Sequence, residues 1–449
     1  MIYQTQLKIN DSWVDVSSYT SDYQKEVSLY NDLKPTLNTC TFYLNRDVDI
    51  DLLNYLLTTS NRIEVAISID STPWFTGIVS PNYAVTENKY GLGKIKIQCE
   101  DYTKSKLDIK IDSYINYTNY QVCNIAGTGI VNSLCTLAGV QLAQNVSIPN
   151  VIVSLVIMPE DNKTYLSTLQ DILFEVGYSF YFNESGKLVL YKLFDWGSTE
   201  SITNALVNDP QNKAISNVIN SIEVGQSRKS YSEILVKYNE LEYLEQATLV
   251  DEAVPISLEA NAYYPLASDT KTVFVEFADV AQGREIIAVT SASLDTTKET
   301  DIVLFKPFQF YGKKGEYSFH NTGSVANTIT KLQVVGNAYV KKGDCVAREA
   351  IPSIEEKKTL DYSSKYITTD ADAKQLANIL KNYYANSFRT YTTTSRVNFD
   401  IGSYVKIVDN YKLKFIGYGR VIEKKYKIDK DCLLYTSPSP RDKRQYRMP

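Results

Sequence analysis

Residues 161–193 read DNKTYLSTLQDILFEVGYSFYFNESGKLVLYKL, and here a helical pattern runs directly into a strand pattern. Thr164 is a typical N-cap residue. Gly177 is suited to end the helix, because glycine tolerates the positive φ of a C′ position. Between them, apolar residues recur at intervals of three and four and predict one buried helical stripe: Leu166, Leu169, Ile172, Leu173 and Val176.

After Gly177 the apolar period changes from helical to alternating, which predicts a β-hairpin. The turn at residues 183–186, Asn-Glu-Ser-Gly, has the residue types that short hairpin loops need. Alternation places these side chains on the buried face of the two strands: Tyr178, Phe180, Phe182, Leu188 and Leu190. Taken alone, residues 161–193 indicate an ordinary α+β packing unit without catalytic residues.

The surrounding segments give this unit its context. Residues 129–140, GIVNSLCTLAGV, predict another short helix ended by glycine. Residues 399–407 and 417–422 form a strand-turn-strand pattern near the end of the chain. In this order, the pieces resemble the hub protein at the distal end of a bacteriophage tail tube, over about residues 1–430. That family includes baseplate hubs of contractile tails, tail-associated proteins of long non-contractile tails and spike hubs of bacterial secretion machines.

Composition is typical of a globular protein. The chain has 449 residues, 44% of them hydrophobic and 22% charged, so we expect three or four domains. The longest apolar run, residues 151–158, is shorter than the roughly 20 residues of a membrane span, so no membrane insertion is expected. The N-terminus alternates like a strand and does not resemble a signal peptide, which favours synthesis and assembly in the bacterial cytoplasm.

The last eighteen residues, 432–449, resemble translated sequencing-adapter DNA and are interpreted as not native. They carry four basic residues and Asp442, a net charge of +3. Since the whole chain has a formal net charge of −5, residues 1–431 carry −8. The natural protein is therefore expected to be more acidic than the printed sequence.

The expected fold class is a mixed, β-rich α+β multidomain protein. It has two tube-type antiparallel β-barrels, an α/β insert and a β-sandwich insert. Alternating strand patterns fill the first segment, and the resemblance supplies the discontinuous second barrel. The expected divisions are a first tube-like barrel at 1–110, an α/β insert at 111–212, a second tube-like barrel from 213–240 with 360–431, a β-rich sandwich-like insert at 241–359, and the segment 432–449.

Several local features belong to this scheme. Residues 49–57 predict a short helix in the first domain, and residues 369–384 predict the clearest helix of the C-terminal part, capped by Thr369 or Asp370. Gly77 lies in the middle of a strand pattern, which marks a bulge or a close backbone approach. By resemblance, a paired strand then ends in an acidic-aromatic corner at residues 99–102.

Residues for catalysis, cofactors or metals are not predicted. The single histidine, His320, is interpreted as a turn or surface residue near a strand end, because general-base and zinc chemistry usually need more histidines. The six cysteines lack Cys-x-x-Cys spacing and are interpreted as buried free thiols. Glycines 127–129 and 417–419 match no phosphate-binding motif. Acidic groups such as Asp47, Asp49 and Asp51, or Glu355 and Glu356, are expected on solvated faces.

The resemblance implies a structural tail hub of a phage or prophage virion, assembled as a homotrimer and not an enzyme. Three chains with two barrels each would form six tube-like units and dock a threefold tip on a sixfold tube. The implied partners are the tail tube protein, the distal tail protein and tail fibre or receptor-binding proteins. DNA would pass through an acidic lumen without specific binding. Two alternatives stay open: the N-terminal part of a tail-associated lysin (peptidase or glycosidase) whose catalytic domain is missing, and a carbohydrate-binding module in residues 245–355.

Overall fold

In the computed structural model, most of the described residues lie in strands and few lie in helices. It describes residues 3–31, 34–45, 50–59, 62–80, 84–86, 94–122, 127–144, 152–157, 159–193, 204–208, 223–227, 231–252, 255–265, 273–352, 358–384, 388–395, 401–402, 404–409, 415–429 and 432–437.

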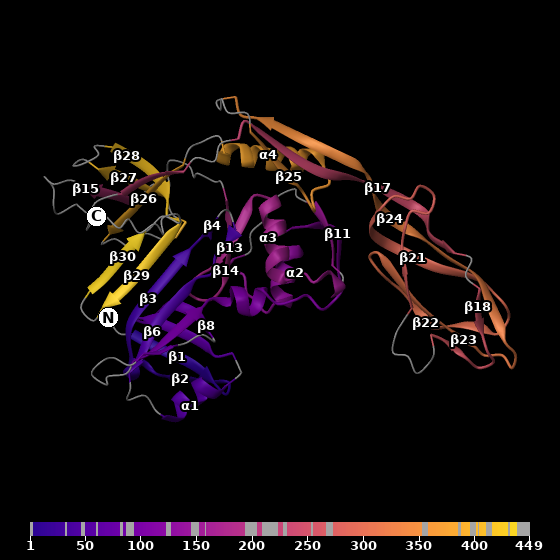
Figure 1. Cartoon of the computed structure of the whole chain (residues 1–449), viewed down its shortest axis with the longest axis horizontal. Helices are drawn as coiled ribbons and strands as arrows, with labels where there is room; N and C mark the ends of the chain where they lie inside the picture. Colours follow the sequence, from indigo (N-terminus) through magenta and orange to yellow (C-terminus); the bar gives the residue numbers. More distant parts are fainter. Residues whose placement is uncertain are drawn as a thin grey trace, which may run out of the picture.

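The largest sheet among the described residues has twelve strands and unites both ends of the chain (Figure 1). Its strands are β1 (Tyr3–Ile9), β2 (Ser12–Asp15), β3 (Thr20–Ser28), β6 (Thr39–Asn45), β7 (Glu64–Ile69), β8 (Thr72–Val79), β9 (Ala84–Thr86), β10 (Lys94–Glu100), β16 (Glu223–Ser227), β26 (Phe388–Ser395), β29 (Glu423–Asp429) and β30 (Cys432–Ser437). They run in the order β16-β26-β30-β29-β3-β6-β10-β8-β7-β1-β2, with β9 paired to β10. The antiparallel β3–β29 pair joins the N-terminal strands to the C-terminal ones.

The alternation of apolar and polar residues along the N-terminal strands explains how these strands form a core. On β6, Cys40, Phe42 and Leu44 are buried, whereas Thr39 and Thr41 are partly exposed. These apolar faces pack together with helix α1 (Ile50–Thr58), which lies where residues 49–57 predicted a helix. Gly77 marks a close backbone approach, as expected, because a Cβ there would lie 3.0 Å from the carbonyl carbon of Glu100.

The α/β insert contains residues 161–193, and the helix and hairpin predicted there are confirmed. The one-turn helix η2 (Thr103–Leu107) lies before the expected start of the insert at residue 111. The elements that follow are β11 (Ile115–Gln121), α2 (Ile130–Leu137), β12 (Ile152–Ile157), the short turn η3 (Pro159–Asp161), α3 (Tyr165–Glu175), β13 (Tyr178–Phe182) and β14 (Leu188–Lys192). Leu169, Ile172 and Leu173 of α3 are completely buried. Gly177 has φ +77°, as its C′ role requires.

The Thr164 side chain caps α3 as predicted. Its Oγ1 accepts a hydrogen bond from the Ser167 amide at 3.1 Å, and Ser167 Oγ accepts one from the Thr164 amide at 3.2 Å. Thr164→Ala should therefore cost about 1 kcal/mol and increase hydrogen exchange in the first turn of α3. Thr164→Ser is the matched control, since it keeps the hydroxyl, and equal exchange in both variants would contradict the capping role.

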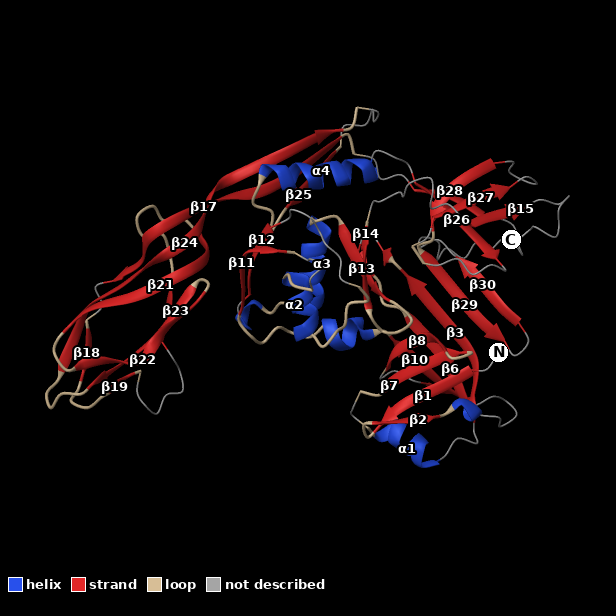
Figure 2. Cartoon of the chain, turned by 180° about the vertical axis from the view of Figure 1, so that it is seen from behind, coloured by secondary structure: helices blue, strands red, loops and turns tan. Residues whose placement is uncertain are grey.

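A long two-layered arm projects from the insert, on the side away from the twelve-stranded sheet (Figures 1 and 2). Its layers are a five-stranded sheet of β17 (Glu233–Glu252), β18 (Ile256–Leu258), β21 (Ile286–Lys298), β24 (Asn327–Ala350) and β25 (Thr359–Ser363), and a four-stranded sheet of β19 (Tyr263–Tyr264), β20 (Val273–Glu276), β22 (Ile302–Tyr311) and β23 (Lys314–Asn321). Both layers contribute to one apolar core, which includes Val289, Phe319 and Val334.

Helix α4 (Asp370–Tyr384) packs against β17 and β24 at the arm's base, and Thr369 Oγ1 accepts a hydrogen bond from the Asp372 amide.

The remaining described strands form two small sheets. One contains β15 (Asn204–Asn208), β27 (Tyr404–Asp409) and β28 (Phe415–Arg420), and the other contains β4 (Tyr30–Asn31) and β5 (Lys34–Pro35). The described parts of the predicted strand-turn-strand pattern form β27 and β28. The sequence-based domain boundaries stay predictions. Strand β17 runs across the expected boundary at residue 240, and residues 432–437 are strand β30 between β29 and β26.

Candidate functional site

A buried lysine connects three parts of the fold. Lys25 lies on β3, and its ammonium donates a hydrogen bond to the Trp74 carbonyl of β8 at 2.6 Å. It also lies 3.3 Å from the carboxylate of Glu184 in the insert hairpin. The same nitrogen is 5.0 Å from the Trp74 ring centroid and 4.8 Å from that of Tyr426 on β29. One cation therefore contacts the N-terminal strands, the insert and the C-terminal strands.

Burial lowers the pKa of Lys25, and the nearby Glu184 carboxylate opposes this effect. A charged ammonium at this position needs all its partners, because an unpaired buried charge is strongly unfavourable. The two aromatic faces supply cation–π attraction. This arrangement favours a mechanical role, fixing three segments together.

Asn38 makes a second connection close to the first. Its side-chain amide donates to the Phe182 carbonyl of the insert at 3.1 Å and accepts from the Ser28 amide at 3.0 Å. Its backbone amide donates to Asp101 at 2.9 Å, and Asp101 also accepts from the Thr103 amide at 2.9 Å. Asp101 and the adjacent Tyr102 are both buried, so the chain has an acidic-aromatic corner where the resemblance implied one.

Burial raises the pKa of Asp101 to about 6 from its usual 3.8, although the hydrogen bonds oppose the rise. Because the folded state binds this proton more tightly than the unfolded state, the contribution to stability is full below pH 4 and is lost as the pH rises through about 6. Between pH 4 and 8, wild type should therefore lose on the order of 2 kcal/mol relative to Asp101→Asn. Parallel denaturation curves of both proteins over this range would check this, and a constant difference would contradict it.

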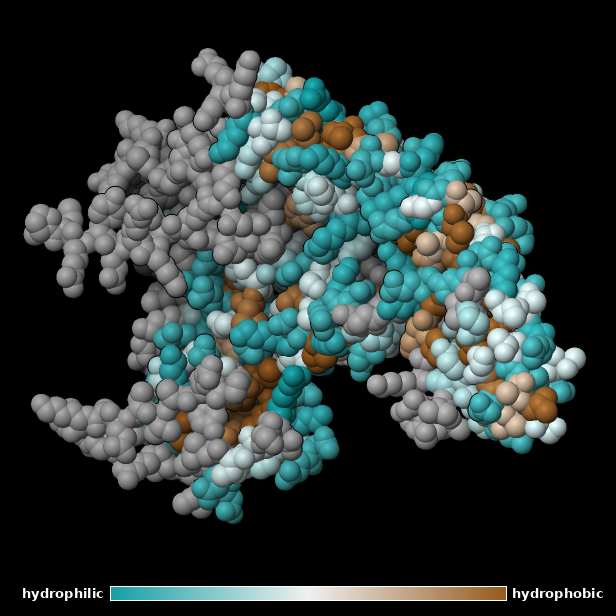
Figure 3. Space-filling view, turned by 45° about the vertical axis from the view of Figure 1, so that its right-hand side comes forward, coloured by the Kyte–Doolittle hydropathy of each residue, from teal (hydrophilic) through white to brown (hydrophobic). Residues whose placement is uncertain are grey.

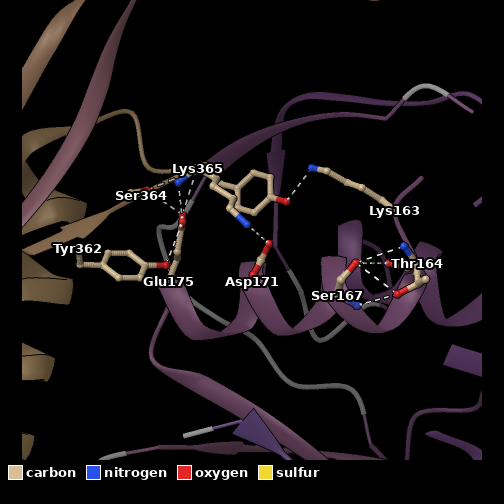
Figure 4. A network of polar contacts seen from close by, with 9 residues as sticks. Lys163, Thr164, Ser167, Asp171, Glu175, Tyr362, Ser364 and Lys365 are labelled. Carbon is tan, nitrogen blue, oxygen red and sulfur yellow. Dashed lines mark hydrogen bonds and ion pairs between the residues drawn. The ribbon is translucent and has the colours of Figure 1, made fainter. Parts of the chain in front are cut away.

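The buried carboxylate of Glu175, at the end of α3, joins the insert to the base of the arm (Figure 4). It accepts hydrogen bonds from the backbone amides of Lys365, Tyr366 and Ile367 at 2.7, 3.0 and 3.2 Å. The Ser364 hydroxyl donates to it at 2.8 Å, and the Tyr362 hydroxyl at 3.4 Å. Burial raises the pKa of Glu175, whereas these donors favour its ionised form. We call these residues the Glu175 cage.

Further contacts surround the Glu175 cage. Lys365 forms an ion pair with Asp171 of α3 at 2.6 Å, and Lys163 donates to the Tyr366 hydroxyl at 3.4 Å (Figure 4). Gly177 lies directly against α4, since a Cβ there would be 2.6 Å from Ile379 Cδ1. The insert is thus attached both to the twelve-stranded sheet and to the arm.

The residues considered for catalysis are not brought together in the described part of the chain. His320 stands near the end of β23, half-buried, with its ring stacked on Tyr263 at 3.9 Å. Asp51 lies in the first turn of α1. Asp47, Asp49, Glu355 and Glu356 lie outside the described residues. The described residues contain no group of three or more His, Cys, Asp or Glu arranged to hold a metal.

The cysteines, glycines and basic residues described next lie in places where they have structural roles. Cys40, Cys99 and Cys135 are buried free thiols, and Cys345 is a partly buried one. Gly129 stands at the N-cap of α2, and Gly127 also has a positive φ. Lys341 and Lys342 form a short basic run, and both have carboxylate partners: Lys341 lies 2.7 Å from Glu285, and Lys342 lies 3.4 Å from Glu240.

On the face of the molecule shown in Figure 3, the described residues are largely hydrophilic, and apolar side chains form separate patches. The exposed apolar residues include Trp13 on β2 and Val303, Leu304 and Phe305 on β22. Among the described helices, none has the length and apolar character needed to span a bilayer.

Solved structures with the same fold identify the architecture. The tail protein from Neisseria meningitidis MC58 matches with a TM-score of 0.52 at 11% identity, and the match covers 97% of this chain and 95% of that one. The 43 kDa tail protein of prophage MuSo2 from Shewanella oneidensis matches with a TM-score of 0.50 at 12% identity, covering 96% and 97%. No family model matches the chain, and no curated protein matches its sequence.

The chain therefore has the β-rich fold of phage tail proteins, which confirms at the level of fold the resemblance drawn from the sequence.

Proposed function

We propose that this protein is a structural hub of a phage or prophage tail. It trimerises at the distal end of the tail tube, connects the tube to the tip and fibres, and leaves a channel for DNA. The observation that carries the proposal is the sheet that passes through β3 and β29, because it joins N-terminal and C-terminal strands side by side. Two tube-type units in one chain would give six in a trimer, matching a sixfold tube.

The connections around Lys25, Asn38 and Glu175 support a scaffold role. Each one uses buried polar groups to fix segments that are far apart in sequence, and none brings together a nucleophile, base and oxyanion donors. In this proposal the partners are the tail tube protein, the distal tail protein and fibre or receptor-binding proteins, and the location is the virion. The protein assembles in the bacterial cytoplasm and acts without catalysis.

Light scattering coupled to size-exclusion chromatography tests the proposal. The expected mass is three times the chain mass of 50.8 kDa. Electron microscopy of the same peak should reveal a ring with an open centre that binds the end of a tail tube. A stable monomer that does not bind tube protein would exclude the hub role, and clearing of cell-wall material on a zymogram would favour the lysin alternative.

One observation favours carbohydrate binding as a second role of the arm. Phe305 is 52% exposed and lies against Tyr263 and His320, so an aromatic group stands at the surface of β22 and β23. Aromatic faces of this kind suit stacking with apolar faces of ligands. Glycan binding that is lost in Phe305→Ala would support this role.

A further inference from the structure

The strands on both sides of the β3–β29 pair share a polar face that points away from the apolar core. Along β3, Tyr23 and Val27 are buried, whereas Gln24 is exposed and Glu26 partly exposed. We call this surface the junction face. Its described residues are Asp22, Gln24 and Glu26 of β3, Thr39, Thr41 and Tyr43 of β6, Lys94, Lys96 and Gln98 of β10, and Lys425 of β29.

Two lysines of the junction face have carboxylate partners on this face. Lys94 Nζ lies 2.6 Å from Asp22 Oδ2. Lys425 Nζ lies 3.0 Å from Glu26 Oε1 and 3.5 Å from Glu423 Oε1. The remaining residues are mainly amides and hydroxyls. With Glu423, which lies two residues before Lys425 on the same face of β29, this face carries three lysines and three carboxylates. Its described part is therefore balanced in charge, although the chain as a whole is acidic.

Stability does not explain these pairs well. The side chains of Lys94 and Asp22 are 46% and 33% exposed, and those of Lys425 and Glu26 are 44% and 46% exposed. Ion pairs exposed to this degree add little to folding stability, because water and salt screen them. The carboxylates of these pairs do, however, lower the positive electrostatic potential that an approaching polyanion meets at the lysines.

Double-stranded DNA binds proteins mainly where lysine or arginine replaces counterions at the phosphates. A lysine that already has a carboxylate partner offers little net positive charge for this exchange. Resting on the proposed hub function, we propose that DNA passes along the junction face and that Asp22 and Glu26 mask Lys94 and Lys425 from its phosphates. The face then neither holds the DNA nor presents a purely acidic barrier.

The double variant Asp22→Asn/Glu26→Gln tests the masking. Asparagine suits position 22, because Asp22 has φ +53°, a conformation that asparagine tolerates. The probe is a short linear DNA duplex, measured by fluorescence anisotropy over a salt series. Near 50 mM salt the variant should bind at least tenfold more tightly than wild type, and the plot of log affinity against log salt should steepen by about 2 for each chain that contacts DNA.

A matched control changes the same net charge on the arm. Glu240→Gln/Glu276→Gln removes the partners of Lys342 and Lys314, which lie 3.4 and 3.8 Å away. Affinity gained only by the junction-face variant supports the proposal. Equal gain in both variants, or none in either, overturns it. Light scattering on each protein reports the oligomeric state separately, so a monomer would overturn the hub function, whereas a trimeric variant without DNA affinity would overturn only the masking.

Discussion

Replacing Glu175 by alanine should loosen the attachment of the arm to the insert and cost about 3 kcal/mol of local stability. The substitution removes the acceptor of the Lys365 amide and of the Ser364 hydroxyl. The Tyr366 and Ile367 amides lose their bonds to the carboxylate and keep only their contacts with Ser364 Oγ at 3.3 and 2.9 Å. Buried donors that lose their acceptors incur the full desolvation cost, which exceeds the net gain from an ordinary hydrogen bond. Hydrogen exchange should show the amides of residues 365–367 becoming unprotected before the rest of the fold.

Asp171→Asn provides the matched control for this experiment. It removes a carboxylate on the same helix that also contacts Lys365, but through side chains 36% and 60% exposed. An exposed pair of this kind contributes about 0–1 kcal/mol, so the exchange of residues 365–367 should change little. If both variants increased exchange equally, the Glu175 cage would not be the element that holds the arm.

Local sequence patterns predicted the elements whose determinants lie within a few residues. The helix and hairpin of residues 161–193 are confirmed, because Thr164, Gly177 and the apolar spacing all act over one or two turns of chain. Gly77 was interpreted as a bulge or a close approach, and the structure has the close approach, since a glycine within a strand often stands where another backbone segment leaves no room for a side chain. These are the parts of the fold in which side-chain chemistry directly restricts the backbone.

The connections between distant segments were not predicted, for different reasons. Glu175 gave no signal, because its donors lie about 190 residues later in the chain. Lys25 did carry a signal in the sequence, because it alternates in phase with Tyr23 and Val27, which are buried. A charged residue at a core-facing position of a strand indicates a buried polar contact. The β3–β29 pairing brings Tyr23 opposite Ile428, and periodicity carries no information on such a partner.

Gly77→Ala should be among the most damaging single substitutions in the N-terminal part of the fold. The added methyl group would overlap the carbonyl oxygen of Glu100 and lie 3.1 Å from the Phe75 ring. Backbone cannot move aside as a flexible side chain can, so β8 and β10 must separate where Ile78 pairs with Glu100. Overpacking of this kind costs about 3 kcal/mol, and it also displaces Asp101, which follows β10 and bonds to Asn38.

Gly343→Ala is the control for this substitution, because a Cβ at residue 343 of β24 would meet nothing within 4 Å. Its effect should stay within about 0.5 kcal/mol. Hydrogen exchange along β10 should increase in the Gly77 variant and stay unchanged in the control. If Gly77→Ala kept the exchange pattern and melting temperature of wild type, the strand pair β8–β10 would have room for a side chain, and the close approach at Gly77 would not be a requirement of this fold.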